Sequence, residues 1–238
     1  MTAVHVGGAF DDMRLADFRF LDLAAGGGKV RVQLLTDEAI LAATGKAPKF
    51  PLAERKYLLE SLRFVESVEA VSSITAPPLK IDQASLSQIP DGPPVPVNPK
   101  SSRKKVVVTG CYDWFHSGHV RFFEECAELG DLYVVVGHDA NILLLKGAGH
   151  PLFPASQRRY IVGTCRFVTG AFVSTGDGWM DAEPEFIRIK PDIYAVNEDG
   201  NKPEKLAFCQ RHGIEYKVLK RLPKQGLPKR ESTKLRGF

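Results

Sequence analysis

The second half of the chain alternates short, continuously apolar runs with amphipathic stretches. Apolar runs of strand length occupy residues 105–110, 131–137, 171–174, 192–197 and 216–219. Helical periodicity separates them at residues 119–129, 157–167 and 202–212. Strands without polar alternation are buried on both faces, and strands that alternate with helices form parallel sheets. The pattern therefore predicts an α/β fold with a Rossmann-like, doubly wound parallel sheet.

The first part of the chain repeats the pattern of the second. Identical residues recur at an offset of 102, or 103 after a one-residue shift: Gly8 and Gly110, Asp11 and Asp113, Asp37 and Asp139, Arg55 and Arg158. Their order and spacing favour an internal repeat over two unrelated units that share generic glycines. Residues 75–103 hold seven prolines and one glycine, which indicates a stiff linker. We predict two tandem units, 1–74 and 104–238, joined by the linker 75–103.

Composition argues against several classes of protein. The chain has 238 residues, of which 44% are hydrophobic and 25% charged, and no apolar stretch approaches the roughly 20 residues of a membrane span. Residues 1–10 lack the basic start and apolar core of a secretion signal. The four cysteines are scattered without a CxxC pair, which argues against a disulfide framework or a zinc site. We expect a soluble protein of the reducing cytoplasm that does not act on membranes.

The C-terminal segment is strongly basic. Residues 217–238 hold eight lysines and arginines against one acid, Glu231, in a chain of net charge +4. An arm that binds nucleic acid is one interpretation, but the segment has no aromatic residue before Phe238 to stack on bases. We therefore expect a phosphate-rich small ligand and no nucleic acid.

The sharpest motif is His116-Ser-Gly-His119, which lies where a buried strand runs into a helix. In an open parallel sheet this is the carboxyl edge, where ligands bind. The glycine lets the backbone approach a phosphate, and the start of the helix adds free N–H donors and a positive dipole end. The alternatives are two histidines that only cap the helix, or a metal pair, although no nearby Cys, Asp or Glu completes a metal site. The pattern favours a phosphate site.

These residues resemble the signature of the cytidylyltransferase family within the HxGH nucleotidyltransferase superfamily. Other segments follow in the family's order: Lys146-Gly147, Arg158, Arg166-Phe-Val and Ser232-Thr233-Lys-Leu-Arg236. The resemblance covers residues 105–236 and includes the glycerol-3-phosphate and ethanolamine-phosphate cytidylyltransferases. It implies that the histidines and the lysine hold a triphosphate, and that the Ser-Thr signature caps a helix beside phosphate. CTP is the family's usual nucleotide, and close relatives use ATP.

The resemblance implies transfer of a nucleoside monophosphate from CTP or ATP to a phosphorylated small alcohol, polyol or sugar, with release of pyrophosphate. Such a transfer needs donors that stabilise charge on the phosphate oxygens, for which we expect His116, His119 and Lys146. Further nucleotide contacts are expected from Gly110, Tyr112, Asp113, Phe115, Gly118, Asp139, Arg166, Asn197, Ser232, Thr233 and Arg236. Mg²⁺ should accompany the nucleotide, with Asp113 and Asp139 as the nearest acidic candidates.

Some features depart from the family or fit other readings. Six basic residues could take the role of the family's arginine: Lys220, Arg221, Lys224, Lys229, Arg230 and Arg236. The loop 176–181, which contains Trp179, could cover the acceptor or be a surface turn. A class I aminoacyl-tRNA synthetase shares similar signatures, but this chain has no room for tRNA-reading domains. A non-catalytic nucleotide-binding or scaffold protein on the same fold is the remaining alternative.

The first unit has lost the residues that would bind phosphate. Where the second reads His116-Ser-Gly-His119, the first reads Arg14-Leu-Ala-Asp17, and Thr44 takes the place of Lys146. A carboxylate at position 17 would repel a triphosphate. We therefore expect a truncated, degenerate copy. Because related enzymes pair two such units, we also expect an internal pseudo-dimer, and homodimerisation is an open alternative.

Overall fold

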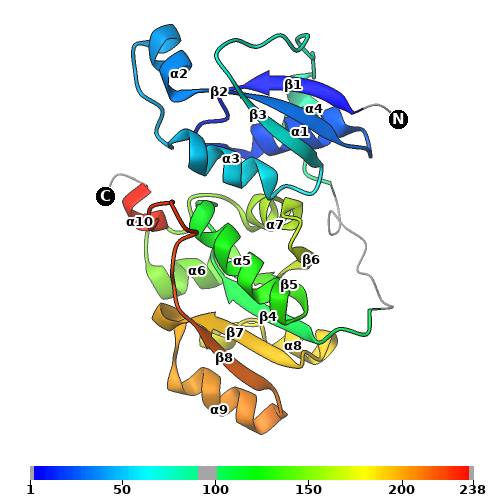
Figure 1. The fold of residues 1–238 in the computed structure, drawn as a ribbon. Helices are drawn as coiled ribbons and strands as arrows, with labels where there is room; N and C mark the ends of the chain where they lie inside the picture. The colour runs from blue at the N-terminus through cyan, green and yellow to red at the C-terminus, as the bar shows by residue number, and fades with distance from the viewer. Residues whose placement is uncertain (1–2, 91–100, 236–238) are drawn as a thin grey trace. The chain divides into compact units, whose positions relative to one another are not determined.

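The computed structural model describes residues 3–90 and 101–235, and the chain divides into two compact units, Met1–Gln88 and Ile89–Phe238. The elements of the first unit are β1 (Val4–Gly8), α1 (Leu15–Ala25), β2 (Val30–Leu35), α2 (Asp37–Thr44), α3 (Leu52–Glu60), β3 (Val65–Val71) and α4 (Gln83–Ser87). Those of the second are β4 (Lys105–Gly110), α5 (Ser117–Leu129), β5 (Asp131–Val136), α6 (Asp139–Lys146), α7 (Ala155–Thr164), β6 (Val168–Val173), η1 (Gly178–Met180), α8 (Glu183–Ile189), β7 (Ile193–Asn197), η2 (Glu198–Gly200), α9 (Pro203–His212), β8 (Glu215–Leu219) and α10 (Ser232–Leu235). The predicted α/β class is confirmed (Figure 1).

The second unit is built on a five-stranded parallel sheet in the order β6-β5-β4-β7-β8. The chain moves outward from β4 through β5 to β6 and then returns to the other side of β4 as β7. This reversal makes the β4/β7 boundary a topological switch point, where open α/β sheets bind ligands. Only Val106 and Val107 of β4 pair with β7, so the two strands are unpaired with each other toward their carboxyl ends.

Helices cover both faces of this sheet, as the continuously apolar strands predicted. Val107, Tyr133 and Val135 pack in one core cluster with Phe186 of α8 and Phe208 of α9. The alternate residues of β4 and β5 are also buried, and α5 and α7 contact these strands. Figure 1 shows α8 and α9 on one side of the sheet and α5 and α7 on the other. Among the described residues, no helix is both long enough and apolar enough to cross a membrane.

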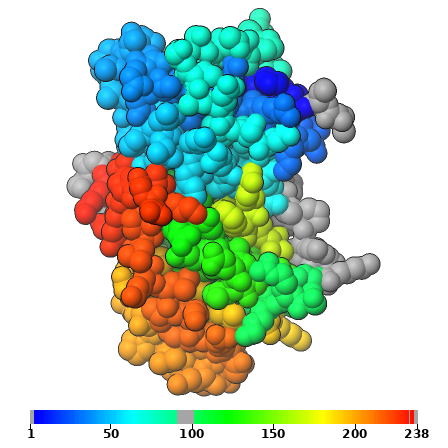
Figure 2. Space-filling model, viewed as in Figure 1, coloured from blue at the N-terminus to red at the C-terminus, as the bar shows by residue number. Residues whose placement is uncertain are grey.

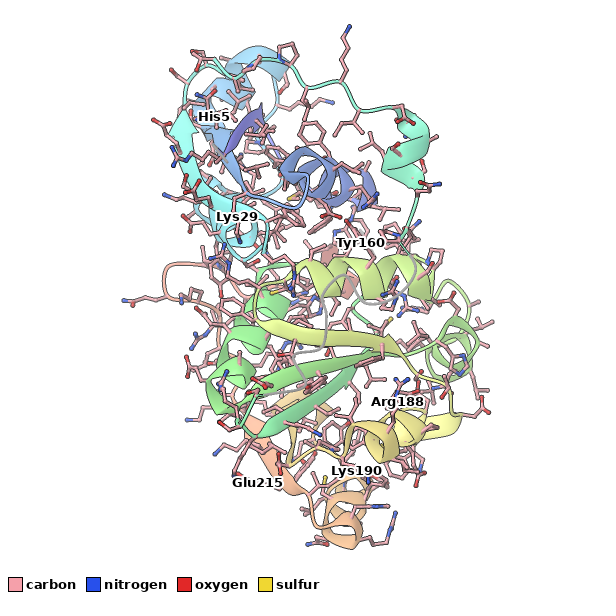
Figure 3. The ribbon with its side chains drawn as sticks, turned by 90° about the vertical axis from the view of Figure 1, so that its right-hand side faces the viewer. His5, Lys29, Tyr160, Arg188, Lys190 and Glu215 are labelled. Carbon is pink, nitrogen blue, oxygen red and sulfur yellow. The ribbon has the colours of Figure 1, made fainter. Side chains whose placement is uncertain are left out.

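The first unit has a three-stranded parallel sheet in the order β1-β2-β3, which matches the order β4-β5-β6. The register shift in β2 after Val30 has a counterpart in β5 after Leu132, 102 positions later. One face of the first sheet carries polar side chains, including His5 and the Arg31–Glu66 ion pair, and Figure 3 labels His5 there. Within residues 3–90, the unit has no counterpart of α8 to cover that face.

Each unit contains an equivalent hydrogen-bond network around a buried arginine. In the second unit, buried Arg158 donates to the carbonyls of Phe153, Cys111 and Gly137 at 2.7–2.8 Å and to Asp139 at 2.6 Å. In the first unit, Arg55 donates to four partners at 2.6–3.0 Å, namely the carbonyls of Phe50, Ala9 and Leu35 and the carboxylate of Asp37. Each partner lies 102 or 103 positions before its equivalent.

An aspartate completes this framework in each unit. The carboxylate of Asp113 accepts from the backbone N–H groups of Leu152 and Phe153 at 2.8–2.9 Å. Asp11 accepts from the N–H groups of Lys49 and Phe50 at 2.6 and 2.9 Å. Both aspartates thus tie the turn after the first strand to a segment nearly forty residues later.

The segment expected to be a linker contains a helix. Helix α4 lies inside residues 75–103 and packs against α1, so this part of the segment belongs to the first compact unit. The side chain of Asp82 caps α4 by accepting from the N–H of Ser85 at 2.9 Å.

Candidate active site

The turn between β4 and α5 brings two imidazoles into one stack. His116 is the N-cap residue of α5, and its Nδ1 accepts from the N–H of Gly118 at 3.1 Å. The ring centroids of His116 and His119 lie 4.0 Å apart, with 22° between their planes. A Cβ atom on Gly118 would come within 2.9 Å of the His116 ring, so glycine permits this stack. Nε2 of His116 and Nδ1 of His119 are buried and bind no described residue.

Both imidazoles are held in the neutral form. Burial, followed by the charges of Arg221 and Arg230, lowers the pKa of His116 from 6.5 to about 3. Burial, followed by His116, Arg221 and Lys146, lowers the pKa of His119 well below its ordinary value. Because Nδ1 of His116 accepts a hydrogen bond, the proton of the neutral ring is assigned to Nε2. His116 thus offers a free N–H donor.

A cavity of about 500 Å³ opens beside the histidines at the carboxyl ends of β4, β5 and β7. Four cationic side chains line it, namely Lys146 of α6, Lys202, Lys205 and Arg221. Its lining also includes Gly110, Tyr112, Gly118, Asn141, Trp179, Asp181, Asn197 and Asp199. The side-chain Oδ1 of Asn197 is buried there without a partner among the described residues. The donors that an anion requires are therefore the Nε2–H of His116 and the cationic side chains, whereas Oδ1 of Asn197 is an acceptor and suits a donor group of a ligand.

The loop 174–181 lines the cavity and is fixed by side-chain hydrogen bonds. Buried Asn141 donates from its amide to the carbonyl of Gly178 and accepts from the N–H of the same residue, both at 2.9 Å. Nε2 of His138 lies 2.9 Å from the carbonyl oxygen of Gly176. The Ser174 hydroxyl donates to Asp181 at 2.5 Å. Trp179 is 49% exposed and lines the cavity from this loop.

The basic C-terminal segment crosses α5 after β8, and Figure 2 shows this orange-red segment lying on the green surface of α5. Lys224 pairs with Glu124 of α5 at 2.7 Å. Arg221 pairs with Asp199 at 2.5 Å and lines the cavity. Of the six basic candidates for the family arginine, the described cavity lining includes Arg221, while Arg236 lies outside the described residues.

The structure brings seven of the expected site residues together around the cavity: Gly110, Tyr112, His116, Gly118, His119, Lys146 and Asn197. Asp113 and Asp139 do not line it, because their carboxylates hold backbone N–H groups and Arg158, respectively. Phe115 contacts the site indirectly, since its ring stacks on His119 at 5.8 Å.

The remaining expected residues lie elsewhere or are not described. Arg166 is exposed and lies two residues before β6, so it lies at the amino-terminal edge of the parallel sheet, opposite the histidines. Ser232 begins α10, and its hydroxyl lies 3.4 Å from the carbonyl oxygen of Trp114. The side chain of Thr233 and all of Arg236 fall outside the described residues.

Sequence reasoning missed several polar residues of the cavity, among them Asn141, Asp181, Asp199, Lys202 and Lys205. A signal existed for Asn141, because it lies in the first turn of the helix that follows a buried strand, at the sheet edge that binds ligands. Lys205 lies in the first turn of the helix after β7. Burial and the charge of Lys202 lower the pKa of Lys205, whose Nζ donates to the carbonyl of Gly200 at 3.1 Å.

Comparison with known proteins agrees with this geometry. The model of a family described as cytidylyltransferase-like matches residues 107–212, which include the histidines, Lys146 and Asn197. An FAD synthase from Ferroglobus placidus is 35% identical over 120 residues, covering 49% of this chain and 75% of that protein. The chain belongs to the cytidylyltransferase-like family. The expected family is thus confirmed, and the chain is a nucleotidyltransferase of that family.

Two further proteins are similar to part of the chain. The bifunctional protein HldE from Nitratiruptor is 33% identical over 102 residues, covering 42% of this chain and 21% of that protein. A solved lipopolysaccharide core biosynthesis protein from Thermoplasma volcanium is 24% identical, with a TM-score of 0.41 over 54% of this chain and 98% of its own.

Proposed function

We propose that the second unit transfers a nucleoside monophosphate from CTP or ATP to a phosphorylated small molecule and releases pyrophosphate. The observation that carries this proposal is the stacked pair His116 and His119, whose free nitrogens are buried beside a cation-lined cavity at the β4/β7 switch point. A polar cavity that is lined by neutral N–H donors and by cations suits a ligand that carries many acceptor oxygens.

The proposed reaction develops negative charge that the residues of the cavity stabilise. A phosphate oxygen of the acceptor attacks the α-phosphorus, and the bond to the β-phosphate oxygen breaks as pyrophosphate leaves. Negative charge grows on the bridging oxygen and on the leaving group. We assign the stabilisation of that charge to Nε2–H of His116, together with His119, Lys146 and Arg221. Donors that are fixed before the reaction need no reorganisation when charge develops.

Magnesium fits this arrangement as a partner of the nucleotide. Within residues 3–90 and 101–235, no cluster of three His, Cys, Asp or Glu side chains could hold a metal by itself. Mg²⁺ commonly binds one or two carboxylates together with substrate phosphates, and Asp181 and Asp199 line the cavity. Bound there, the ion would neutralise charge on the phosphates.

We also propose that the first unit is a degenerate copy that keeps the framework and lacks the chemistry. Its Asp17 accepts from the N–H of Arg14 at 2.7 Å, and Arg14 pairs with Asp12. Thr44, at the position of Lys146, donates to the carbonyl of Ile40 at 2.8 Å. The repeated Arg55 and Arg158 networks support common descent of the units. A cytoplasmic location, and pairing between units or chains, stay predictions.

The test is a matrix of nucleotides and phosphomonoesters, monitored by pyrophosphate release with and without Mg²⁺. The matrix includes ATP with FMN, because the similar protein from Ferroglobus placidus is an FAD synthase, and CTP with glycerol 3-phosphate, because of the signature resemblance. We expect release with one pair, and a loss of about 100-fold or more in His119→Ala, since one donor to developing charge contributes about 3 kcal/mol.

His5→Ala, on the polar sheet face of the first unit, is the matched control and should keep the wild-type rate. Release at wild-type rate in His119→Ala would exclude the proposed role of the pair. Nucleotide binding without release in any combination would favour a non-catalytic binding protein.

A further inference from the structure

The hydroxyl of Tyr112 has no partner in the protein as described. Tyr112 follows β4, is 7% exposed, and lines the same cavity as His116 and His119. Its Oη atom is buried and makes no hydrogen bond to a described residue. A buried hydroxyl that has lost water without gaining a partner destabilises the folded protein. A reason for keeping it must therefore lie outside the fold of the unliganded chain.

The ring of Tyr112, by contrast, is placed by the fold. Its backbone lies in the left-handed region at φ 52°, and the ring folds back over Gly110. A Cβ atom on Gly110 would come within 2.8 Å of Cζ and 3.1 Å of Oη. The ring also packs on Phe123 at 5.2 Å and meets His119 edge-on at 5.3 Å. These contacts require an aromatic ring and make no use of the hydroxyl.

The first unit provides an internal comparison. Phe10, 102 positions before Tyr112, has φ 45° and lies over Gly8 in the same way. A Cβ atom on Gly8 would come within 2.9 Å of the Phe10 ring. Both units therefore need the ring in this strained conformation. The hydroxyl occurs in the unit that has the two histidines and is missing from the unit that has Arg14 and Asp17.

We propose that the hydroxyl of Tyr112, one of the expected nucleotide contacts, donates a hydrogen bond to a phosphate oxygen of the nucleotide. This inference rests on the proposed function and adds a phosphate donor to it. The edge-on contact with His119 places the ring beside the expected phosphate site, and phosphate oxygens are the strongest acceptors expected in a cation-lined cavity. Burial also raises the pKa of Tyr112, so the hydroxyl keeps its proton.

The test is Tyr112→Phe, which removes the hydroxyl and keeps the ring that Phe10 shows to be compatible with this backbone. Binding of CTP, ATP, inorganic tripolyphosphate, cytidine and adenosine is measured by calorimetry with Mg²⁺. We expect affinity for the nucleotide and for tripolyphosphate to fall about tenfold or more, and that for the nucleosides to stay unchanged. The Tm of the unliganded variant should equal or exceed that of the wild type.

The matched control is Phe10→Tyr, which adds a hydroxyl at the equivalent position of the first unit and should leave every affinity unchanged. Wild-type affinity of Tyr112→Phe for tripolyphosphate, an equal loss for the nucleosides, or a lower Tm of the unliganded variant would each overturn the inference. Because these measurements need no turnover, they are independent of pyrophosphate release and of the His119→Ala result.

Discussion

The stacked histidines are costly to protonate. Each buried ring already faces Arg221, and a second imidazole lies 4.0 Å away. A proton on either ring would place a further positive charge among these groups in a poorly solvated environment. We expect a bound triphosphate to raise the pKa of both histidines, because its negative charge favours the protonated form.

We expect this burial to make stability depend on pH. The pKa of His116 is about 3 in the folded chain and 6.5 as the reference, so unfolding takes up a proton between these values. The stability from this group is therefore complete above pH 6.5 and is lost as the pH falls toward 3, at up to about 1.4 kcal/mol per pH unit. His116→Asn keeps a side chain that can cap α5 and removes the proton uptake.

Urea unfolding of the unliganded proteins between pH 4 and 7 checks this expectation. The slope of stability against pH should be shallower in His116→Asn than in the wild type. His5→Asn, in the first unit, should keep the wild-type slope. Identical slopes in wild type and His116→Asn would contradict the assigned origin.

Arg221 is the basic side chain of the C-terminal segment that we expect to bind phosphate. It lines the cavity, whereas its neighbour Lys220 is exposed and does not. Arg221→Ala should weaken NTP binding about tenfold or more and make it less sensitive to salt, because a charge-assisted contact is lost. Removing its charge should also raise the pKa of His116. Calorimetry at several salt concentrations, with Lys220→Ala as the control, checks this; equal effects of the two variants would contradict it.

At the level of elements, α6 acts as the support for the loop 174–181. The side chain of Asn141 satisfies both the N–H and the carbonyl of Gly178, which no aliphatic residue can do. The loop is thereby fixed to the same helix that ends at Lys146. Helix α6 therefore fixes the position of the loop that carries Trp179 and also carries Lys146.

Asn141→Ala should free this loop. We expect a loss of about 1–3 kcal/mol in the free energy of unfolding, since two partly buried backbone groups lose their partner. The KM for the phosphorylated acceptor should rise several-fold while the Kd for NTP stays within about twofold, and Trp179 fluorescence should change. Asn201→Ala, which removes an exposed hydrogen bond to Tyr216, is the control. Unchanged Trp179 fluorescence together with a wild-type KM would show that Asn141 does not position the loop.

At the level of the whole molecule, two units share one framework and differ in chemistry. Arg55 and Arg158 bind partners at equivalent positions of the two units. The first unit nevertheless has Asp17 where the second has His119. Burial raises the pKa of Asp17, and the N–H of Arg14 occupies its carboxylate. The first unit thus has the same framework as the second and lacks the two histidines.

We therefore expect one nucleotide per chain. Calorimetric titration with the preferred NTP should give a stoichiometry of one, and Asp17→Ala should leave both stoichiometry and affinity unchanged. His119→Ala should weaken the single site. Two sites per chain, or a loss of affinity in Asp17→Ala, would show that the first unit takes part in binding.

The class of fold and the position of the two histidines at the sheet edge were predictable from the sequence alone. Continuously apolar strands indicated a parallel sheet covered on both faces, and the histidines lie at its carboxyl edge as their position after a strand predicted. The offset of 102 anticipated the shared framework, because identical side chains make identical contacts in both units. These features depend on local spacing, which periodicity and motifs record directly.

The contacts of individual polar residues could not be predicted from local sequence. Asp113 and Asp139 face framework partners, Arg166 lies at the far edge of the sheet, and Asn141 reaches the loop 174–181 from α6. Arg221 meets the cavity because the chain leaves β8 at the carboxyl edge. These contacts join segments that are far apart in sequence, by 19 residues for Asp139 and Arg158, 37 for Asn141 and Gly178, and 39 for Asp113 and Leu152. The residue type of an aspartate or arginine is the same whether its side chain binds a ligand or holds the framework. Its role follows from the partners that the fold places beside it.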